Sequence, residues 1–181
     1  MQIIRTQEDV NKALDSMVSY IDFLRDSKDD PWLLIGIADG GIPLSRELAK
    51  RVKEKLGITL PTGSLNVSFH RDDIGSRPIT RPKTPTDLPK SIDRANIILL
   101  DDVIHSGRTI RAALDELFEH GRPRLTKLMT MVDRGHRVVP IQPDYAAVTL
   151  DLENDRSLKV VIDPDDAKGN RIWVMDKEKK L

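Results

Sequence analysis

The chain has 181 residues, of which 39% are hydrophobic and 32% charged, a composition typical of a folded globular domain. Lys and Arg together number 29, as do Asp and Glu, so the chain as a whole has no electrostatic attraction to nucleic acid or membranes. The absence of cysteine excludes disulfides and thiolate metal sites. The first residues lack a signal-peptide layout and no apolar run reaches membrane-spanning length, so we expect a cytoplasmic protein without a membrane partner.

The first third of the chain alternates helix and strand patterns. A capping box formed by Thr6 and Asp9 predicts the start of an amphipathic helix. Residues 32–37, "WLLIGI", form a continuous apolar run, which is typical of a strand buried on both faces. The chain then turns at Gly40–Gly41 and enters a second helix. Residues 64–69 alternate apolar and polar side chains and predict a half-exposed strand.

Residues 70–95 have a different character, with four prolines, many charges and little apolar periodicity. The alternation of strand and helix patterns resumes immediately afterwards, so we interpret residues 1–181 as one domain with a long internal loop. Long irregular loops in compact domains are uncommon and often act as lids over a site. A disordered surface excursion is the alternative interpretation.

The second half of the chain resumes the alternation. Residues 96–100 form another apolar strand, a helix pattern starts at Ser106, and residues 125–132 predict the next strand. Three further strand patterns follow within residues 145–176, and we expect them to form an antiparallel extension. The whole pattern predicts an α/β fold, with a mainly parallel sheet flanked by helices on both faces. Ligands of such sheets bind outside the carboxyl ends of the strands.

The stretch "IILLDDVIHSGRT", residues 97–109, carries the strongest chemical signal at such a strand end. The adjacent carboxylates of Asp101 and Asp102 are suited to accept hydrogen bonds from the two hydroxyls of a ribose. Residues 106–109 fall at the start of the next helix, where free backbone N–H groups and the helix dipole favour a phosphate. The alternative is structural, with acids that only end a strand and a serine that only caps a helix.

This stretch resembles the phosphoribosyl pyrophosphate (PRPP) binding motif of type I phosphoribosyltransferases. Two other segments, "FHRDDIGSRP" at 69–78 and "VDRGHRVVPIQPDY" at 132–145, are similar to the PyrR family, whose members regulate pyrimidine operons and have uracil phosphoribosyltransferase activity. The resemblance extends from the first helix to about Tyr145. The residues that match the PRPP motif are Ile97, Ile98, Leu99, Leu100, Asp101, Asp102, Val103, Ile104, His105, Ser106, Gly107, Arg108 and Thr109.

The resemblance implies a Mg²⁺-dependent reaction of uracil with PRPP that yields UMP and pyrophosphate. It places the ribose hydroxyls at Asp101 and Asp102, and the base at Val132, Asp133 and Arg134. It also implies that Mg²⁺ arrives bound to PRPP; the histidines show no metal-ligand spacing, so we expect no metal held by protein side chains alone. A homodimer or larger assembly is the expected oligomeric state.

The pyrophosphate side of the site departs from the family pattern. The pyrophosphate loop corresponds by position to Ala38, Asp39, Gly40 and Gly41. Relatives usually carry a basic residue and a threonine where this chain has Ala38 and Asp39, and an acid repels pyrophosphate unless a cation lies between them. Arginines of the proline-rich loop are the expected source of positive charge, Arg71 as a catalytic residue and Arg77 and Arg81 as lid residues. Solvated loop arginines are the alternative.

His105 stands at the variable position of the motif, and its imidazole is suited to move a proton near the base. An exposed loop histidine is the alternative, and a purine base is a second possible substrate class.

RNA binding to a pyrimidine-operon leader mRNA is a further implication, carried by Arg134, His136 and Arg137. However, the Gly-Lys-Asn run of RNA-binding relatives aligns here with residues 147–149, which contain no lysine. A regulator of this kind with little catalysis is the alternative to an enzyme.

Overall fold

The computed structural model describes residues 2–25, 31–67, 85–89, 91–153 and 156–176. Eight strands, three α-helices and one short 3₁₀ helix are formed in these ranges. In chain order they are β1 (Gln2–Arg5), α1 (Gln7–Leu24), β2 (Trp32–Ile37), α2 (Ala38–Leu56), β3 (Thr62–Leu65), β4 (Asn96–Ile104), α3 (Arg108–Glu119), β5 (Leu125–Asp133), β6 (Tyr145–Thr149), β7 (Arg156–Val161), η1 (Ala167–Gly169) and β8 (Arg171–Asp176).

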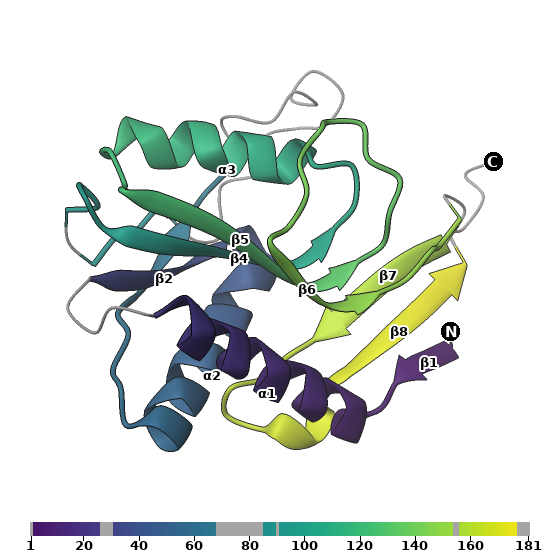
Figure 1. Ribbon diagram of the computed structural model, residues 1–181. Helices are drawn as coiled ribbons and strands as arrows, with labels where there is room; N and C mark the ends of the chain where they lie inside the picture. Colours follow the sequence, from purple (N-terminus) through teal and green to yellow (C-terminus); the bar gives the residue numbers. More distant parts are fainter. Residues whose placement is uncertain (1, 26–30, 68–84, 90, 154–155, 177–181) are drawn as a thin grey trace.

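The main sheet has five parallel strands in the order β3-β2-β4-β5-β6. Helices α1 and α2 cover one face and α3 covers the other, as Figure 1 shows. Strands β2 and β4 are buried on both faces where their residues form continuous apolar runs. All six residues of β2 are buried, as are Ile97 to Leu100 of β4. The predicted α/β class is therefore confirmed.

Each face of the sheet has its own apolar core. On the α1 and α2 side, residues such as Leu14, Met17 and Leu48 pack against the alternate strand residues Ile98 and Leu100. On the α3 side, the core is built from residues that include Ile97, Leu99, Ile110 and Leu117. Within the described ranges, none of the helices combines the length and the apolar character needed to span a membrane.

A second, antiparallel sheet has the order β1-β8-β7 and packs beside α1 (Figure 1). Two details correct the expected extension over residues 145–176. Strand β6 belongs to the main sheet, where it pairs in parallel with β5 from Met129↔Tyr145 onwards. The third strand of the small sheet is β1, which the sequence did not predict because four residues carry no clear periodicity.

The described end of the expected lid is a fixed part of the fold. The N–H of Ser64 donates to the C=O of Asp87 at 2.8 Å, and the N–H of Asp87 donates to the C=O of Ser64 at 2.9 Å. The side chain of Ile92 is fully buried. The expectation that the lid reaches residue 95 is therefore corrected, because residues 85–89 and 91–95 pack against β3 and the α3 side of the core.

Candidate active site

Strand β4 carries the two aspartates inside the sheet. The sequence predicted a strand that ends at Leu100, but β4 continues to Ile104 because β5 pairs with it as far as Ile104↔Asp133. The side chain of Asp101 is 6% exposed, and that of Asp102 is partly exposed. The two acids therefore lie in the carboxyl-terminal half of β4, at the edge of the sheet where ligands of parallel sheets bind.

Burial and mutual repulsion oppose the ionisation of the aspartate pair. Burial, together with the neighbouring Asp102 carboxylate, raises the pKa of Asp101 well above its ordinary range. The N–H of Asp102 donates to Asp101 Oδ1 at 3.1 Å, which offsets only part of this cost. Two adjacent buried acids provide hydrogen-bond acceptors for hydroxyl groups at the cost of a lower stability of the protein.

The start of α2 lies directly on β4 beside the aspartates. A Cβ at Gly40 would collide with the Asp102 carboxylate, and a Cβ at Gly41 would collide with the C=O of Leu100. Gly36 in β2 is equally required, because a Cβ there would lie 2.5 Å from the C=O of Gly41. The sequence analysis missed Gly36, although a glycine in the middle of a buried strand indicates a close backbone approach.

The expected pyrophosphate loop is the first turn of a helix. Helix α2 begins at Ala38, immediately after β2, so the residues expected to form a pyrophosphate loop, Ala38 to Gly41, are already helical. Ala38 has φ 41°, a left-handed conformation that a non-glycine residue adopts with strain. Gly36, Gly40 and Gly41 let the first turn of α2 pack closely against β2 and β4, and the helix starts at the carboxyl end of the sheet.

Residues 106–109, the expected phosphate site and from here on called the phosphate cradle, form the turn between β4 and α3 and the first residues of α3. Helix α3 begins at Arg108, two residues later than predicted, because Gly107 takes φ 87° and serves as its N-cap. The N–H of Arg108 donates weakly to Ser106 Oγ at 3.4 Å, and the N-cap itself has no side chain to bond the other free N–H groups. Arg108 and Thr109 are exposed, so the first turn of α3 is open to a ligand.

The end of β5 carries the residues expected at the base. Val132 is buried in the sheet, and the Asp133 carboxylate accepts hydrogen bonds from the N–H of Gly135 at 2.9 Å and from Arg137 at 2.7 Å. The His105 ring meets the His136 ring edge-on, with 6.4 Å between the ring centres. The fold thus brings the paired acids, the cradle and this strand end to one edge of the sheet. Arg71, Arg77 and Arg81 lie outside the described residues.

Comparison with known proteins agrees with this geometry. Residues 6–162 match the family described as "Phosphoribosyl transferase domain". The "Bifunctional protein PyrR" of Corynebacterium diphtheriae is 46% identical over 133 residues, which cover 73% of this chain and 70% of that protein. The protein of the same name from Synechocystis sp. is 37% identical over 163 residues and covers 90% of each chain. The chain belongs to the PyrR family of phosphoribosyltransferases.

Solved structures support the same fold. The hypoxanthine phosphoribosyltransferase of Trypanosoma cruzi superposes with a TM-score of 0.75 and covers 98% of this chain and 96% of that chain. Its sequence identity is 19%, so this likeness bears on the fold and not on the substrate. The PyrR-family chain therefore shares its architecture with a hypoxanthine phosphoribosyltransferase.

Two of the three residues that the PyrR resemblance associates with RNA, Arg134 and Arg137, donate hydrogen bonds to acceptors within the protein. Arg134 is 6% exposed, and its guanidinium donates to the C=O groups of Leu152, Glu153 and Arg156 at 3.4, 3.1 and 3.3 Å. It therefore holds the segment before β7 and turns away from the expected base site. Arg137 is also bonded to protein acceptors, whereas His136 is exposed and lies 3.0 Å from an Asp151 oxygen.

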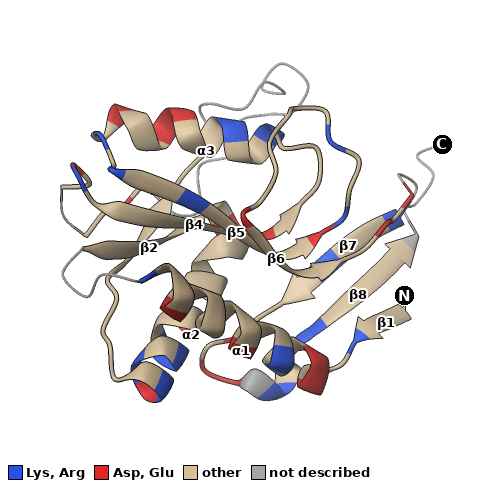
Figure 2. Ribbon diagram, in the orientation of Figure 1, with Lys and Arg blue, Asp and Glu red and all other residues tan. Residues whose placement is uncertain are grey.

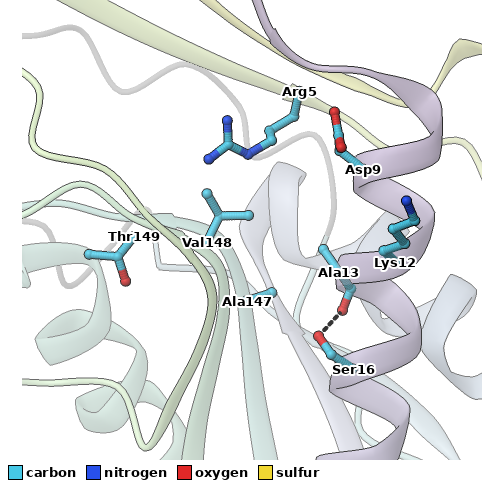
Figure 3. A pocket seen from close by; sticks show the side chains of 8 residues that line it. All are labelled: Arg5, Asp9, Lys12, Ala13, Ser16, Ala147, Val148 and Thr149. Atoms are coloured by element: carbon cyan, nitrogen blue, oxygen red, sulfur yellow. Dashed lines mark hydrogen bonds between the residues drawn. The ribbon is translucent and has the colours of Figure 1, made fainter.

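A groove of about 400 Å³ lies apart from the PRPP motif in this PyrR-family chain (Figure 3). Side chains of α1 line one side and residues 147–149 of β6 line the other, with Arg5 of β1 above them. Its cations are Arg5 and Lys12, and Val148, in the middle of the segment 147–149 that contains no lysine, is 9% exposed. Figure 2 shows Lys and Arg interspersed with Asp and Glu along the helices, in line with the net charge of +0.

The donor chemistry of the site suits the Mg²⁺ that accompanies PRPP in phosphoribosyl transfer. In the described part of the chain, no three His, Asp or Glu side chains gather as a metal cage. Asp101 and Asp102 supply carboxylate oxygens, and Mg²⁺ typically takes one or two carboxylates together with substrate phosphate oxygens. The acids therefore fit a cation that enters with the substrate.

Proposed function

We propose that this protein transfers the phosphoribosyl group of PRPP to uracil, giving UMP and pyrophosphate, with Mg²⁺ bound to PRPP. The observation that carries the proposal is the continuity of the aspartate pair on β4 with the glycine turn at the start of α3, in a chain of the PyrR family. The acids receive the ribose hydroxyls and the open helix end receives the 5′-phosphate.

The chemistry needs mainly positioning and charge stabilisation. The bond between ribose C1 and a pyrophosphate oxygen breaks while the bond from C1 to N1 of uracil forms, and N1 loses its proton. His105 lies between the aspartates and the cradle, where its imidazole is suited to accept that proton. Bound Mg²⁺ supplies positive charge to the leaving pyrophosphate. The first turn of α2, which Gly40 and Gly41 let pack on β4 beside Asp102, lies next to that group, and Arg71, Arg77 and Arg81 add positive charge from the 70–95 segment.

The decisive experiment is to incubate the protein with Mg²⁺ and PRPP and with uracil, hypoxanthine or guanine in turn, and to separate the products by chromatography. UMP from uracil, with no nucleotide from the purines, is the expected outcome. IMP or GMP without UMP would replace uracil by a purine base. An Asp101→Asn variant is the matched control, because it keeps the size of the side chain and removes the charge.

Regulation through RNA is a second candidate function, favoured by the name "Bifunctional protein PyrR" of the relatives. Arg5 and Lys12 of the groove are candidate cations for phosphate contacts, because Lys12 stays 71% exposed while paired with Glu8, whereas Arg134 is buried and Arg137 is bonded to several protein acceptors. A gel shift with a pyrimidine-operon leader RNA, with and without UMP, tests this function. Binding that is unaffected by Arg5→Gln and Lys12→Gln would exclude the groove.

A further inference from the structure

The guanidinium of Arg137 is fully saturated by acceptors of the protein itself. Nε donates to the C=O of Ile141 at 2.9 Å. Nη1 donates to the C=O of His105 at 2.8 Å and to that of Gly135 at 3.3 Å. Nη2 donates to Asp133 Oδ2 at 2.7 Å and to Gln142 Oε1 at 3.1 Å. These five contacts equal the five N–H groups of an arginine, and the side chain is only 12% exposed.

The acceptors come from two segments that are distant in sequence. One is the turn after β4, through the C=O of His105, and the other is the loop at residues 133–142 that follows β5. The backbone adds to this link, because the N–H groups of Val138 and Val139 both donate to the C=O of Ser106 at 2.9 Å. The loop is therefore fastened to the turn that carries the phosphate cradle.

The loop also contains a backbone conformation that needs support. Gly135 has φ 74° and His136 has φ 56°, so two consecutive residues are left-handed and the second is not glycine. The Asp133 carboxylate holds the N–H of Gly135, and Arg137 holds the same carboxylate. Burial opposes ionisation of Asp133, but hydrogen bonds from Arg137 and the Gly135 N–H, with the charge of Arg137, keep its pKa below the usual range.

From these contacts we infer that Arg137 is a positioning residue that sets the distance between the base and the 5′-phosphate by joining loop 133–142 to the turn at His105–Ser106. The inference rests on the proposed function for the identity of the two ligand groups. It assigns Arg137 a different role from a surface cation that contacts RNA phosphates. A lysine would keep the charge but offers only three N–H groups from one atom, so it cannot reproduce the five bonds.

The test compares Arg137→Lys with Arg51→Lys. Arg51 is a matched control, because it is 14% exposed and bonded to Asp15, Asn11 and Glu47, yet lies between α1 and α2 away from the site. For Arg137→Lys we expect the KM for uracil to rise by about tenfold or more, while the Kd for PRPP with Mg²⁺ stays within about twofold of wild type. Arg51→Lys should lower thermal stability and change neither constant.

Hydrogen–deuterium exchange provides a readout that does not need turnover. Amides of residues 135–142 should exchange faster in Arg137→Lys than in wild type, with α1 and β8 unchanged. Asp133→Asn retains the arginine and weakens the same link, so it should accelerate exchange at the same residues. Unchanged exchange and an unchanged KM in Arg137→Lys would overturn the inference. If the wild-type protein makes no UMP but Arg137→Lys still exchanges faster than wild type at residues 135–142, the proposed function is refuted and the structural role of Arg137 stands.

Discussion

The helix starts of this protein differ in how their free N–H groups are satisfied. At α1, Thr6 and Asp9 form a complete capping box, with the Thr6 N–H donating to Asp9 Oδ2 at 2.9 Å. At α2 and α3, the residues before the helix are Ile37 and Gly107, and neither provides a side-chain cap. The first turn of α1 is capped by short side-chain bonds, whereas α3 has only the 3.4 Å bond from the Arg108 N–H to Ser106 Oγ, so the helix starts at the carboxyl end of the sheet are better suited to phosphate groups.

The acids beside these helix starts differ in the same way. Hydrogen bonds from the backbone and side chain of Thr6 lower the pKa of Asp9. Burial and the charge of Asp102 raise the pKa of Asp101. The hydrogen bonds to the Asp9 carboxylate thus outweigh the cost of its burial, whereas the one backbone hydrogen bond from Asp102 to Asp101 does not. The stability of the protein and its proposed activity therefore depend on different helix starts, α1 for stability and α2 and α3 for the proposed activity.

The largest test of this contrast is Asp101→Asn. We expect kcat/KM to fall by about 10²–10³-fold, because a charged acceptor for the ribose is lost. The melting temperature should nevertheless rise, since the variant relieves an unfavourable buried charge. Enzyme assays and thermal melts on the same preparations check both effects, and a fall in melting temperature would contradict the account.

The contributions of Asp101 and Asp9 to the stability of the protein depend on pH in opposite directions. The folded pKa of Asp101 lies above its unfolded value of about 3.9, so its favourable contribution is complete below that pH and is lost as the pH rises through the folded pKa. The stability gain of Asp101→Asn should thus grow as the pH rises above about 4. The folded pKa of Asp9 is depressed, so its contribution is present above the unfolded pKa and is lost as the pH falls. The free energy of unfolding, measured by urea denaturation at several pH values above and below about 4, distinguishes the contribution of Asp101 from that of Asp9.

A smaller effect is expected at the glycines in the first turn of α2. Gly40→Ala forces the Asp102 side chain to move, so we expect kcat/KM to fall by about tenfold with little loss of stability. Gly41→Ala meets a backbone carbonyl that cannot move alone, so it should destabilise the fold by about 1–3 kcal/mol. Gly169→Ala is the control, because a Cβ there meets no atom within 4 Å. Equal losses of stability at positions 40 and 41 would count against this distinction.

The smallest effects are expected at Thr6 and Ser106, where the first substitution should change stability and the second should change the KM for PRPP. Thr6→Ala removes the capping box of α1 and should cost about 1 kcal/mol of stability without changing the KM for PRPP. Ser106→Ala should leave the melting temperature nearly unchanged, because Ser106 Oγ accepts only one long bond, and should raise the KM for PRPP a few-fold, by about 0.5–1.5 kcal/mol of binding energy. Chemical denaturation and steady-state kinetics of the two variants are sufficient to compare them.

The features that could be predicted from the sequence are those that depend on local patterns. The apolar runs of β2 and β4 predicted buried parallel strands, and the Thr6–Asp9 spacing predicted the capped start of α1. The sheet to which β6 belongs could not be predicted, because membership is decided by pairing with β5 and not by the residues of β6. The same holds for the extension of β4 through the aspartates.

In the candidate site, residue types were predicted better than their partners. The sequence placed the acids, Gly40–Gly41 and Arg134 near the carboxyl ends of parallel strands, and the structure has Asp101 and Asp102 within β4, the two glycines at the start of α2 and Arg134 directly after β5. It does not show that Arg134 faces the segment before β7 or that Arg137 uses all its donors on the protein. Both arginines follow β5 within four residues, and their different directions depend on the left-handed backbone at Gly135 and His136.

The small sheet has a consequence for the order of folding. Strand β1 precedes the other described elements in chain order, but its hydrogen-bonding partner is β8, where Gln2 pairs with Val174. Contacts between residues so far apart in sequence form slowly, because closing the intervening chain costs entropy before the pairing is gained. The parallel sheet can therefore assemble during synthesis while β1 waits for β8. We expect a late folding phase that reports the pairing of these two strands.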